Sequence, residues 1–329
     1  MPSMLTPAGE SIERGADDMK VEVLFFDGCP NHEALLPHLR ELLNAGGAEG
    51  TAIELVRVED ADAAEAERFL GSPSVRIDGE DVEPGADRRS DFGLKCRLFA
   101  TPEGLRGMPT DQWVLHALER ARTADALRDT FPARDDALLA LALVRLLARG
   151  KPVTEFMLAA GAGRAFDDVT AQLARWPNIE RDADDAVIGF SGLTLRPTDH
   201  SIQVDDQQLH AWCAWDTLFL PRMLGATAYV RSTCPVSGRR VQLVVAPDGV
   251  EHADPVGIHL SFPPWASTNT ADITGTFCCH VRFLVGADAA QTWLETHPDG
   301  HVLDLAAAFE LGRRTTAPLT ASSAAQECC

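Results

Sequence analysis

The chain has 329 residues, with 29 Lys and Arg against 49 Asp and Glu, and a formal net charge of −20 at pH 7. So acidic a chain is repelled by nucleic acid and by anionic membrane surfaces, and no basic stripe with interleaved aromatic residues offsets the charge. The sequence therefore predicts neither a nucleic-acid partner nor a membrane partner. Its length suffices for two or three domains with their own cores.

The ends and the cysteines of the chain predict a cytoplasmic protein. Residues 1–20 are polar and acidic, without the apolar stretch of a signal peptide, and the longest apolar run, Ala137–Val144, is too short to cross a bilayer. The eight cysteines are therefore more typical of free thiols than of a disulfide framework. Zinc is a weaker alternative, because the sequence contains no Cys-x-x-Cys pair.

In chain order, residues 1–20 are expected to form a disordered leader and residues 21–122 an α/β domain. Its predicted strands occupy residues 21–26, 53–58 and 75–77, and its predicted helices residues 31–43 and 110–122.

The order of these elements resembles the thioredoxin fold. Cys29 directly follows the first strand and Pro73 precedes a later one, where that fold has its active-site cysteine and its cis-proline. The resemblance implies a cysteine at the head of a helix, where unpaired N–H groups lower a thiol pKa. His32 stands where redox members of the fold have a second cysteine, which disfavours a thiol oxidoreductase. The alternative is a small α/β domain in which Cys29 has no special role.

Residues 123–135 are predicted to be a linker, and residues 136–197 a small domain of three helices and a β hairpin. The predicted elements are helices over 136–149, after Thr154 and over 166–176, and the hairpin over 179–194. This order is winged-helix-like. Because the chain is so acidic, we expect a packing domain that covers the core rather than a DNA-binding domain.

Residues 198–314 are predicted to form a mixed core, which makes the whole chain α+β. The predicted elements are strands over 226–232, 241–246, 257–262 and 277–285, and helices over 289–296 and 303–311. Residues 315–329, rich in small side chains, are expected to form a flexible tail that ends in Cys328 and Cys329.

Candidate chemistry begins in the segment Trp212-Cys213-Ala214-Trp215-Asp216. Residues 209–220 are mostly apolar and predict a helix, so Cys213 and Asp216, three residues apart, would share one helical face. A thiol and a carboxylate can then converge on one ligand.

A second candidate segment is Phe277-Cys278-Cys279-His280. Residues 276–285 alternate as a strand, which places Cys279 on the apolar face toward the core and Cys278 on the other face. We therefore expect Cys278 to join the first thiol and the carboxylate in a soft-metal site. His280 shares its face and is a further candidate ligand, although a satisfied core or surface histidine is commoner. Any one of these cysteines alone is more often a small buried hydrophobe.

From about residue 134 to residue 314 the chain resembles the alkylmercury (organomercurial) lyases. The match is densest at Trp212-Cys213-x-x-Asp216-Thr-Leu, Ser232-Thr-Cys234-Pro, Pro255-Val-Gly257 and Phe277-Cys278-Cys279-His280-Val281. The resemblance implies that Cys213, Asp216 and Cys278 are catalytic and bind the mercury of substrate and product. Asp216 would handle the proton, whereas Cys234 would be structural.

The same resemblance implies protonolysis of organomercury compounds to a hydrocarbon and Hg(II), as part of mercuric resistance. No cofactor is implied, and low-molecular-weight thiols would remove the product. The main alternative is a non-catalytic thiol protein that binds or transfers Hg(II). Storage needs no proton donor, so the role of Asp216 distinguishes the two.

Four further thiols, Cys29, Cys96, Cys328 and Cys329, are candidates to relay Hg(II) out of the core. For Cys96 the alternative is a merely buried thiol that does not meet Cys29, in which case the domain would serve docking or stability. The terminal pair resembles the C-terminal thiol pair of mercuric reductases, which makes a mercuric reductase a candidate partner. The competing interpretation of the terminal pair is an accidental exposed tail.

Overall fold

A computed structural model describes residues 19–86, 89–101, 104–128 and 130–324 of the chain. Backbone contacts divide the chain into two compact units, Met1–Thr123 and Ala124–Cys329. Both units combine helices and strands, so the expected α+β class is confirmed. No helix of the described residues is long and apolar enough to cross a membrane.

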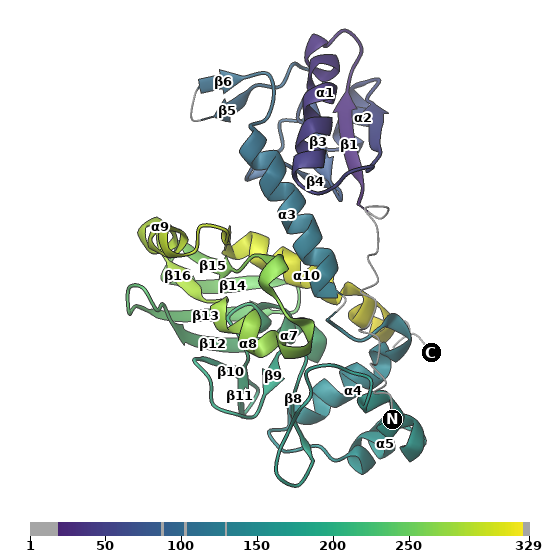
Figure 1. Ribbon diagram of the computed structural model, residues 1–329, viewed down its shortest axis with the longest axis vertical. Helices are drawn as coiled ribbons and strands as arrows, with labels where there is room; N and C mark the ends of the chain where they lie inside the picture. The colour runs from purple at the N-terminus through teal and green to yellow at the C-terminus, as the bar shows by residue number, and fades with distance from the viewer. Residues whose placement is uncertain (1–18, 87–88, 102–103, 129, 325–329) are drawn as a thin grey trace, which may run out of the picture. The chain divides into compact units, whose positions relative to one another are not determined.

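The first unit is built on a four-stranded sheet with the strand order β2-β1-β3-β4 (Figure 1). Strand β1 is parallel to β2 and antiparallel to β3, and β3 pairs with β4 in a hairpin. The strands are β1 (Val21–Phe25), β2 (Ile53–Arg57), β3 (Ser74–Ile77), β4 (Glu80–Asp81), β5 (Phe99–Thr101) and β6 (Gly104–Arg106). The helices are α1 (Pro30–Ala45), α2 (Ala61–Ala66) and α3 (Asp111–Arg128). The strands and helices predicted for this region therefore exist.

The core of this unit forms where one face of α1 packs against the sheet. Leu35, Leu39 and Leu42 recur at helical spacing and are buried together with Val23 of β1 and Leu118 of α3. Helix α1 begins at Pro30, the residue after Cys29. Proline suits this first position because an N–H group there would have no partner within the helix.

The second unit begins with three short helices and continues into an eight-stranded antiparallel sheet. The helices are α4 (Ala137–Leu147), α5 (Glu155–Ala162) and α6 (Phe166–Leu173). The strand order is β14-β13-β12-β10-β11-β9-β8-β7 (Figure 1). Its strands are β7 (Glu180–Arg181), β8 (Val187–Phe190), β9 (Leu193–Thr194), β10 (His200–Val204), β11 (Gln207–Ala211), β12 (Ala228–Thr233), β13 (Arg240–Ala246) and β14 (Gly249–Asp254).

A smaller three-stranded sheet, in the order β16-β15-β17, and four more helices complete the second unit. The strands are β15 (Ile258–Phe262), β16 (Phe283–Val285) and β17 (His301–Asp304). The helices are α7 (Asp216–Leu224), α8 (Ile273–Thr276), α9 (Ala287–Thr296) and α10 (Leu305–Ala324).

The prediction of a helix over residues 209–220 is wrong in its first half. Residues up to Ala211 belong to β11, which is paired on one side with β10 and on the other with β9. Leu209 and Ala211 are buried while the residue between them is not. This alternation of buried and less buried side chains is that of a strand, not of a helix. The helix begins only at Asp216.

The predicted strand over residues 276–285 is shorter than expected. Residues up to Thr276 form α8, whose N-terminus is capped by the side chain of Asp272, which accepts a hydrogen bond from Gly275 N–H at 3.1 Å. A 3-10 turn over Cys278–His280 follows, and only Phe283–Val285 is a strand. Because apolar residues alternate over the whole segment, the sequence predicted a strand where the structure has the end of a capped helix and a turn.

The predicted linker and tail are largely helical in the described residues. Helix α3 continues to Arg128, into the expected linker 123–135. Helix α10 continues to Ala324, into the expected tail 315–329, because Thr315, Thr316 and Leu319 are buried. Threonine hydroxyls in this helix donate back to carbonyls one turn earlier. The expected leader lies outside the described residues apart from its last two residues, and so do Cys328 and Cys329.

Candidate active site

Cys213 and Asp216 meet at the junction between strand β11 and helix α7. Cys213 lies in the turn that joins them, and Asp216 is the first residue of the helix. The backbone N–H of Cys213 donates a hydrogen bond to Oδ2 of Asp216 at 2.7 Å. The expected proximity of the two residues is therefore present, but it comes from a turn at a helix N-terminus, which also favours an acidic side chain.

Aromatic packing fixes this junction in the core of the second unit. The indole N–H of Trp215 donates to the carbonyl of Ala308 at 3.0 Å, and its ring stands edge-on to that of Phe219, with centroids 4.9 Å apart. The Thr217 hydroxyl donates to Ala214 O at 2.7 Å and closes the first turn of α7. The backbone that carries the thiol and the carboxylate is thus held on several sides.

Cys278 approaches the same point from the second segment. The two segments are joined directly, because Ala214 N–H donates to Val281 O at 3.3 Å. Within the 3-10 turn Cys278 is buried and Cys279 is exposed. The expectation that Cys279 packs in the core is therefore wrong, since the two cysteines lie on a turn rather than on opposite faces of a strand. His280 is also exposed and does not join the cluster.

The two sulfur atoms and a carboxylate oxygen of Cys213, Asp216 and Cys278 all lie within 4.8 Å of one another. The exposed fractions of these residues are 0%, 4% and 5%. Two soft donors and one oxygen suit a thiophilic metal rather than a hard cation, which would need more oxygen ligands. The structure thus assembles the three residues that the sequence indicated.

Burial favours the neutral form of each group in this cluster. It raises the pKa of Asp216 to about 7, against the opposing effect of hydrogen bonds from Cys213. Burial, a hydrogen bond with Cys278 and the charge of Asp216 raise the pKa of Cys213 well above its ordinary value. A hydrogen bond with Cys213 lowers the pKa of Cys278, but burial and the charge of Asp216 outweigh it and leave that pKa raised.

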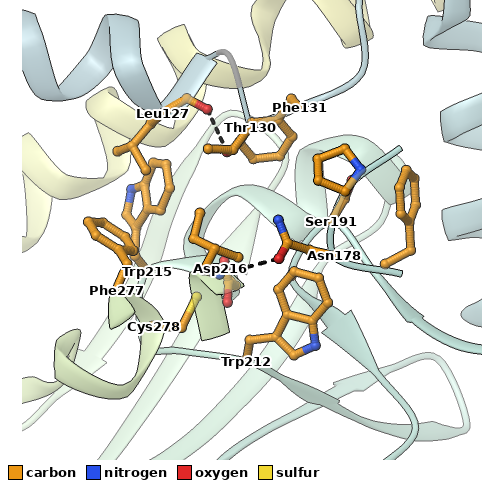
Figure 2. A pocket seen from close by; sticks show the side chains of 14 residues that line it. Leu127, Thr130, Phe131, Asn178, Ser191, Trp212, Trp215, Asp216, Phe277 and Cys278 are labelled. Atoms are coloured by element: carbon orange, nitrogen blue, oxygen red, sulfur yellow. Dashed lines mark hydrogen bonds between the residues drawn. The ribbon is translucent and has the colours of Figure 1, made fainter. Parts of the chain in front are cut away.

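A small pocket with a cavity volume of about 30 Å³ reaches Asp216 and Cys278 of the cluster (Figure 2). Asp216 and Cys278 form part of its wall, and most of the remaining wall is apolar. Aromatic lining residues are Phe131, Phe190, Trp212, Trp215 and Phe277. The pocket therefore places a mostly apolar, aromatic wall beside the carboxyl of Asp216 and the thiol of Cys278.

Two residues of this pocket were not identified as site residues from the sequence. Gly192 has φ +89°, and a Cβ atom there would lie 2.7 Å from the carboxyl carbon of Asp216, so only glycine allows this approach. Asn178 lines the pocket, and its Oδ1 accepts a hydrogen bond from Ile273 N–H at 3.2 Å, which ties α8 to the loop before β7. The turn signal at Ser191-Gly192 marks a bend but not its contact with Asp216.

The remaining described cysteines lie elsewhere. Cys234 is buried in the turn between β12 and β13, where its sulfur accepts a hydrogen bond from Ser237 N–H at 3.5 Å, and it is not part of the cluster. Cys29 and Cys96 belong to the first unit.

Comparison with known proteins covers most of the second unit. The family model "Alkylmercury lyase" matches residues 193–317, and the model "Helix-turn-helix domain of alkylmercury lyase" matches residues 120–191. Among solved structures, the mercury-bound form of MerB2 is similar, with a TM-score of 0.50 and 25% sequence identity, over 61% of this chain and 98% of that chain.

Curated relatives agree with these matches. An alkylmercury lyase of Streptomyces lividans is 41% identical over 187 residues, which are 57% of this chain and 86% of the relative. An alkylmercury lyase of Staphylococcus epidermidis is 40% identical over 171 residues, which are 52% of this chain and 78% of the relative. On this identity and coverage, the chain belongs to the alkylmercury lyase family.

Proposed function

We propose that this protein is an organomercurial lyase in which Cys213 and Cys278 bind the mercury and Asp216 transfers the proton that releases its carbon ligand. The observation that carries the proposal is the convergence of two buried thiols and a buried carboxyl within 4.8 Å of one another. A carbon–mercury bond is nearly unpolarised, so water alone does not cleave it. Two thiolates bind mercury strongly and push electron density toward the carbon atom.

The proton balance of this reaction needs only the three side chains. The first thiol displaces the ligand that accompanies the organomercury cation, and its proton leaves with that ligand. The second thiol gives its proton to the carboxylate of Asp216 and becomes the second thiolate on mercury. The carboxyl then protonates carbon, so the carbon–mercury bond breaks and a carbon–hydrogen bond forms. A hydrocarbon leaves, and mercury stays in the +2 state on two thiolates.

The environment of Asp216 suits this transfer. Because burial raises the pKa of its carboxyl to about 7, the group can both accept and release a proton near neutral pH. The raised thiol pKa values favour protonated thiols before mercury binds, so mercury binding drives the loss of the thiol protons. The aromatic wall of the pocket would hold the organic group beside the carboxyl (Figure 2).

Product release follows from the same chemistry. Hg(II) on two buried thiolates is held tightly, so an external low-molecular-weight thiol must displace it, and no cofactor takes part. We place the protein in the cytoplasm, where such thiols are abundant, and propose a mercuric reductase as a downstream partner.

The parts around this core also enter the proposal. We infer that residues 21–122 form a thioredoxin-like domain, because the sheet order is β2-β1-β3-β4 and Cys29 is the N-cap residue of α1. Pro73 follows a cis peptide bond, and the thiol of Cys29 donates to the carbonyl of Ser72 at 3.5 Å. We infer that residues 136–197, with α4 to α6 followed by the β7-β8 hairpin, form a winged-helix-like domain that packs on the lyase core of residues 198–314.

The alternative, a protein that only binds or transfers Hg(II), predicts a different result in one assay. The reduced full-length protein is mixed with an arylmercury compound and excess small thiol, and the free arene is measured by gas chromatography. A lyase releases arene over several turnovers, whereas a storage protein takes up mercury with its aryl group and releases none. Absence of arene from a protein that demonstrably binds the arylmercury would overturn the proposal.

A further inference from the structure

The first unit brings two thiols to the same backbone residue, Ser72. Cys29 is the N-cap residue of α1, and its thiol donates to the carbonyl of Ser72 at 3.5 Å. Cys96 forms a parallel β-bridge with Ser72: Ser72 N–H donates to Lys95 O at 2.8 Å, and Arg97 N–H donates to Ser72 O at 2.9 Å. Two cysteines 67 residues apart in the sequence are thus both tied to Ser72.

A buried ion network fixes the segment that carries Cys96. The Arg97 side chain has no exposed surface and donates to Asp81 at 2.6 and 2.9 Å, to Glu83 at 2.6 Å and to the hydroxyl of Ser74 at 2.6 Å. Charge-assisted bonds of this kind are geometrically specific. The backbone that carries Cys96 is therefore held by a buried anchor.

The close approach of Ser72 to the segment 95–97 depends on Gly71. This residue has φ +123°, and a Cβ atom there would lie 2.7 Å from Lys95 O. Any side chain at this position would push the 95–97 segment away from Ser72, and with it the thiol of Cys96.

The pair combines a buried thiol with an accessible one. Cys29 is 2% exposed, whereas Cys96 is at the surface. Desolvation of the thiol, followed by the charge and hydrogen bonding of Cys29, raises the pKa of Cys96. The hydroxyl of Ser72 is buried and has no hydrogen-bond partner among the described residues, so a polar group without a partner lies on the residue that joins them.

We propose that Cys29 and Cys96 form a second binding site for a soft, thiophilic metal ion, separate from the cluster of Cys213, Asp216 and Cys278. Such an ion binds two thiolates, releases their two protons and changes no oxidation state. A cation also removes the repulsion that two adjacent thiolates would otherwise feel. That the ion is Hg(II) rests on the proposed lyase function, but the existence of the site does not.

The test uses the full chain in a background where other reactive thiols are replaced, by Cys213→Ala, Cys278→Ala, Cys279→Ser, Cys328→Ser and Cys329→Ser. The reduced protein is loaded with HgCl₂, desalted in the presence of a competing monothiol, and analysed for bound mercury and for sulfur–mercury charge-transfer absorption. We expect one equivalent of Hg(II) to be retained. Adding either Cys29→Ser or Cys96→Ser should lower retention more than tenfold, because one thiolate competes poorly with free monothiol.

A matched control keeps the number of thiols while moving one of them. Leu98 is exposed two residues beyond Cys96, so the double change Cys96→Ser and Leu98→Cys restores a surface thiol without the contact at Ser72. Retention should stay low in this variant. Circular dichroism of each variant checks that the first unit remains folded.

Three results would overturn the inference: either single variant retains Hg(II) as the background does, the relocated thiol restores retention, or the fully reduced background retains none. The lyase reaction is followed separately. In the otherwise unaltered chain, Cys29→Ser and Cys96→Ser should leave single-turnover hydrocarbon release unchanged. Failure of the unaltered protein to release hydrocarbon would sink the proposed function while leaving metal retention by the first unit as predicted.

Discussion

The buried pair, Cys213 and Cys278, and the proposed open pair, Cys29 and Cys96, differ in their surroundings in two respects. Cys213 and Cys278 are both buried and share their site with the carboxyl of Asp216. Of the other pair, Cys29 is buried and Cys96 exposed, and no His, Asp or Glu within the described residues completes a three-ligand cluster with them. A buried proton donor suits bond cleavage, whereas an open pair without one suits binding and transfer.

The largest effect on hydrocarbon release is expected when either thiol of the buried pair is removed. Because both thiolates must hold mercury while carbon is protonated, Cys213→Ala and Cys278→Ala should each abolish hydrocarbon release in a single-turnover assay. Cys279→Ala is the matched control, since this neighbouring thiol is exposed, and it should leave both release and stability nearly unchanged. Near-normal release by Cys278→Ala would remove that thiol from the site.

A smaller effect is expected where the backbone meets Asp216. In Gly192→Ala the new Cβ would lie 2.7 Å from the Asp216 carboxyl carbon at a φ of +89°. We expect a loss of roughly 1–3 kcal/mol in the free energy of unfolding, measured in urea, together with slower hydrocarbon release.

Gly163→Ala is the control for backbone strain alone. Gly163 has φ +62°, but a Cβ atom there would meet nothing within 4 Å. This variant should lose some stability and keep the release rate. If both variants release hydrocarbon at the same rate, the fit of Gly192 against Asp216 does not matter for the reaction.

The buried carboxyl should also make stability depend on pH. Because burial raises the pKa of Asp216 from 3.8 to about 7, the native state binds more protons than the unfolded state between these values. The contribution of Asp216 to the free energy of unfolding is therefore full below about pH 4 and is lost as the pH rises toward 7. Asp216→Asn should remove this part of the slope in urea titrations. An identical pH profile for the two proteins would show that the carboxyl is not buried in neutral form.

The smallest effect is expected for the open pair under steady-state conditions. If Cys29 and Cys96 take Hg(II) from the lyase core, Cys96→Ser should slow multiple turnover when external thiol is scarce. The difference should fade as thiol is added, because thiol in solution then removes the product. Equal rates at limiting thiol would mean that the second site binds metal without serving the lyase reaction.

Sequence reasoning reached the buried cluster by local rules that were only partly correct. The spacing of Cys213 and Asp216 brings them together in a helix and also in a turn that leads into one, so the prediction survived the loss of the helix. Cys278 was identified correctly as a member of the cluster, but Cys279 was wrongly placed in the core. The alternation of apolar residues over 276–285 suggested a strand, so the helix cap at Asp272 and the turn that follows were not recognised.

Contacts between distant segments were beyond local rules. Gly192 contacts Asp216 across 24 residues, and nothing near either residue signals it. The end of α10 is rich in small and hydroxyl side chains, which are typical of a flexible tail. It is helical because Thr315, Thr316 and Leu319 are buried and the helix contacts α4 and α7. Tertiary packing decided both cases, as it often does against local propensity.

The most direct test of the central claim is single-turnover release of arene by Asp216→Asn, compared with the unaltered protein. The variant keeps both thiols and the shape of the side chain but has no proton to deliver. We predict that it still binds one equivalent of arylmercury and releases arene about 10²–10⁴-fold more slowly, the usual contribution of a positioned acid or base. Arene release at the unaltered rate would contradict the account, because the proton would then come from elsewhere.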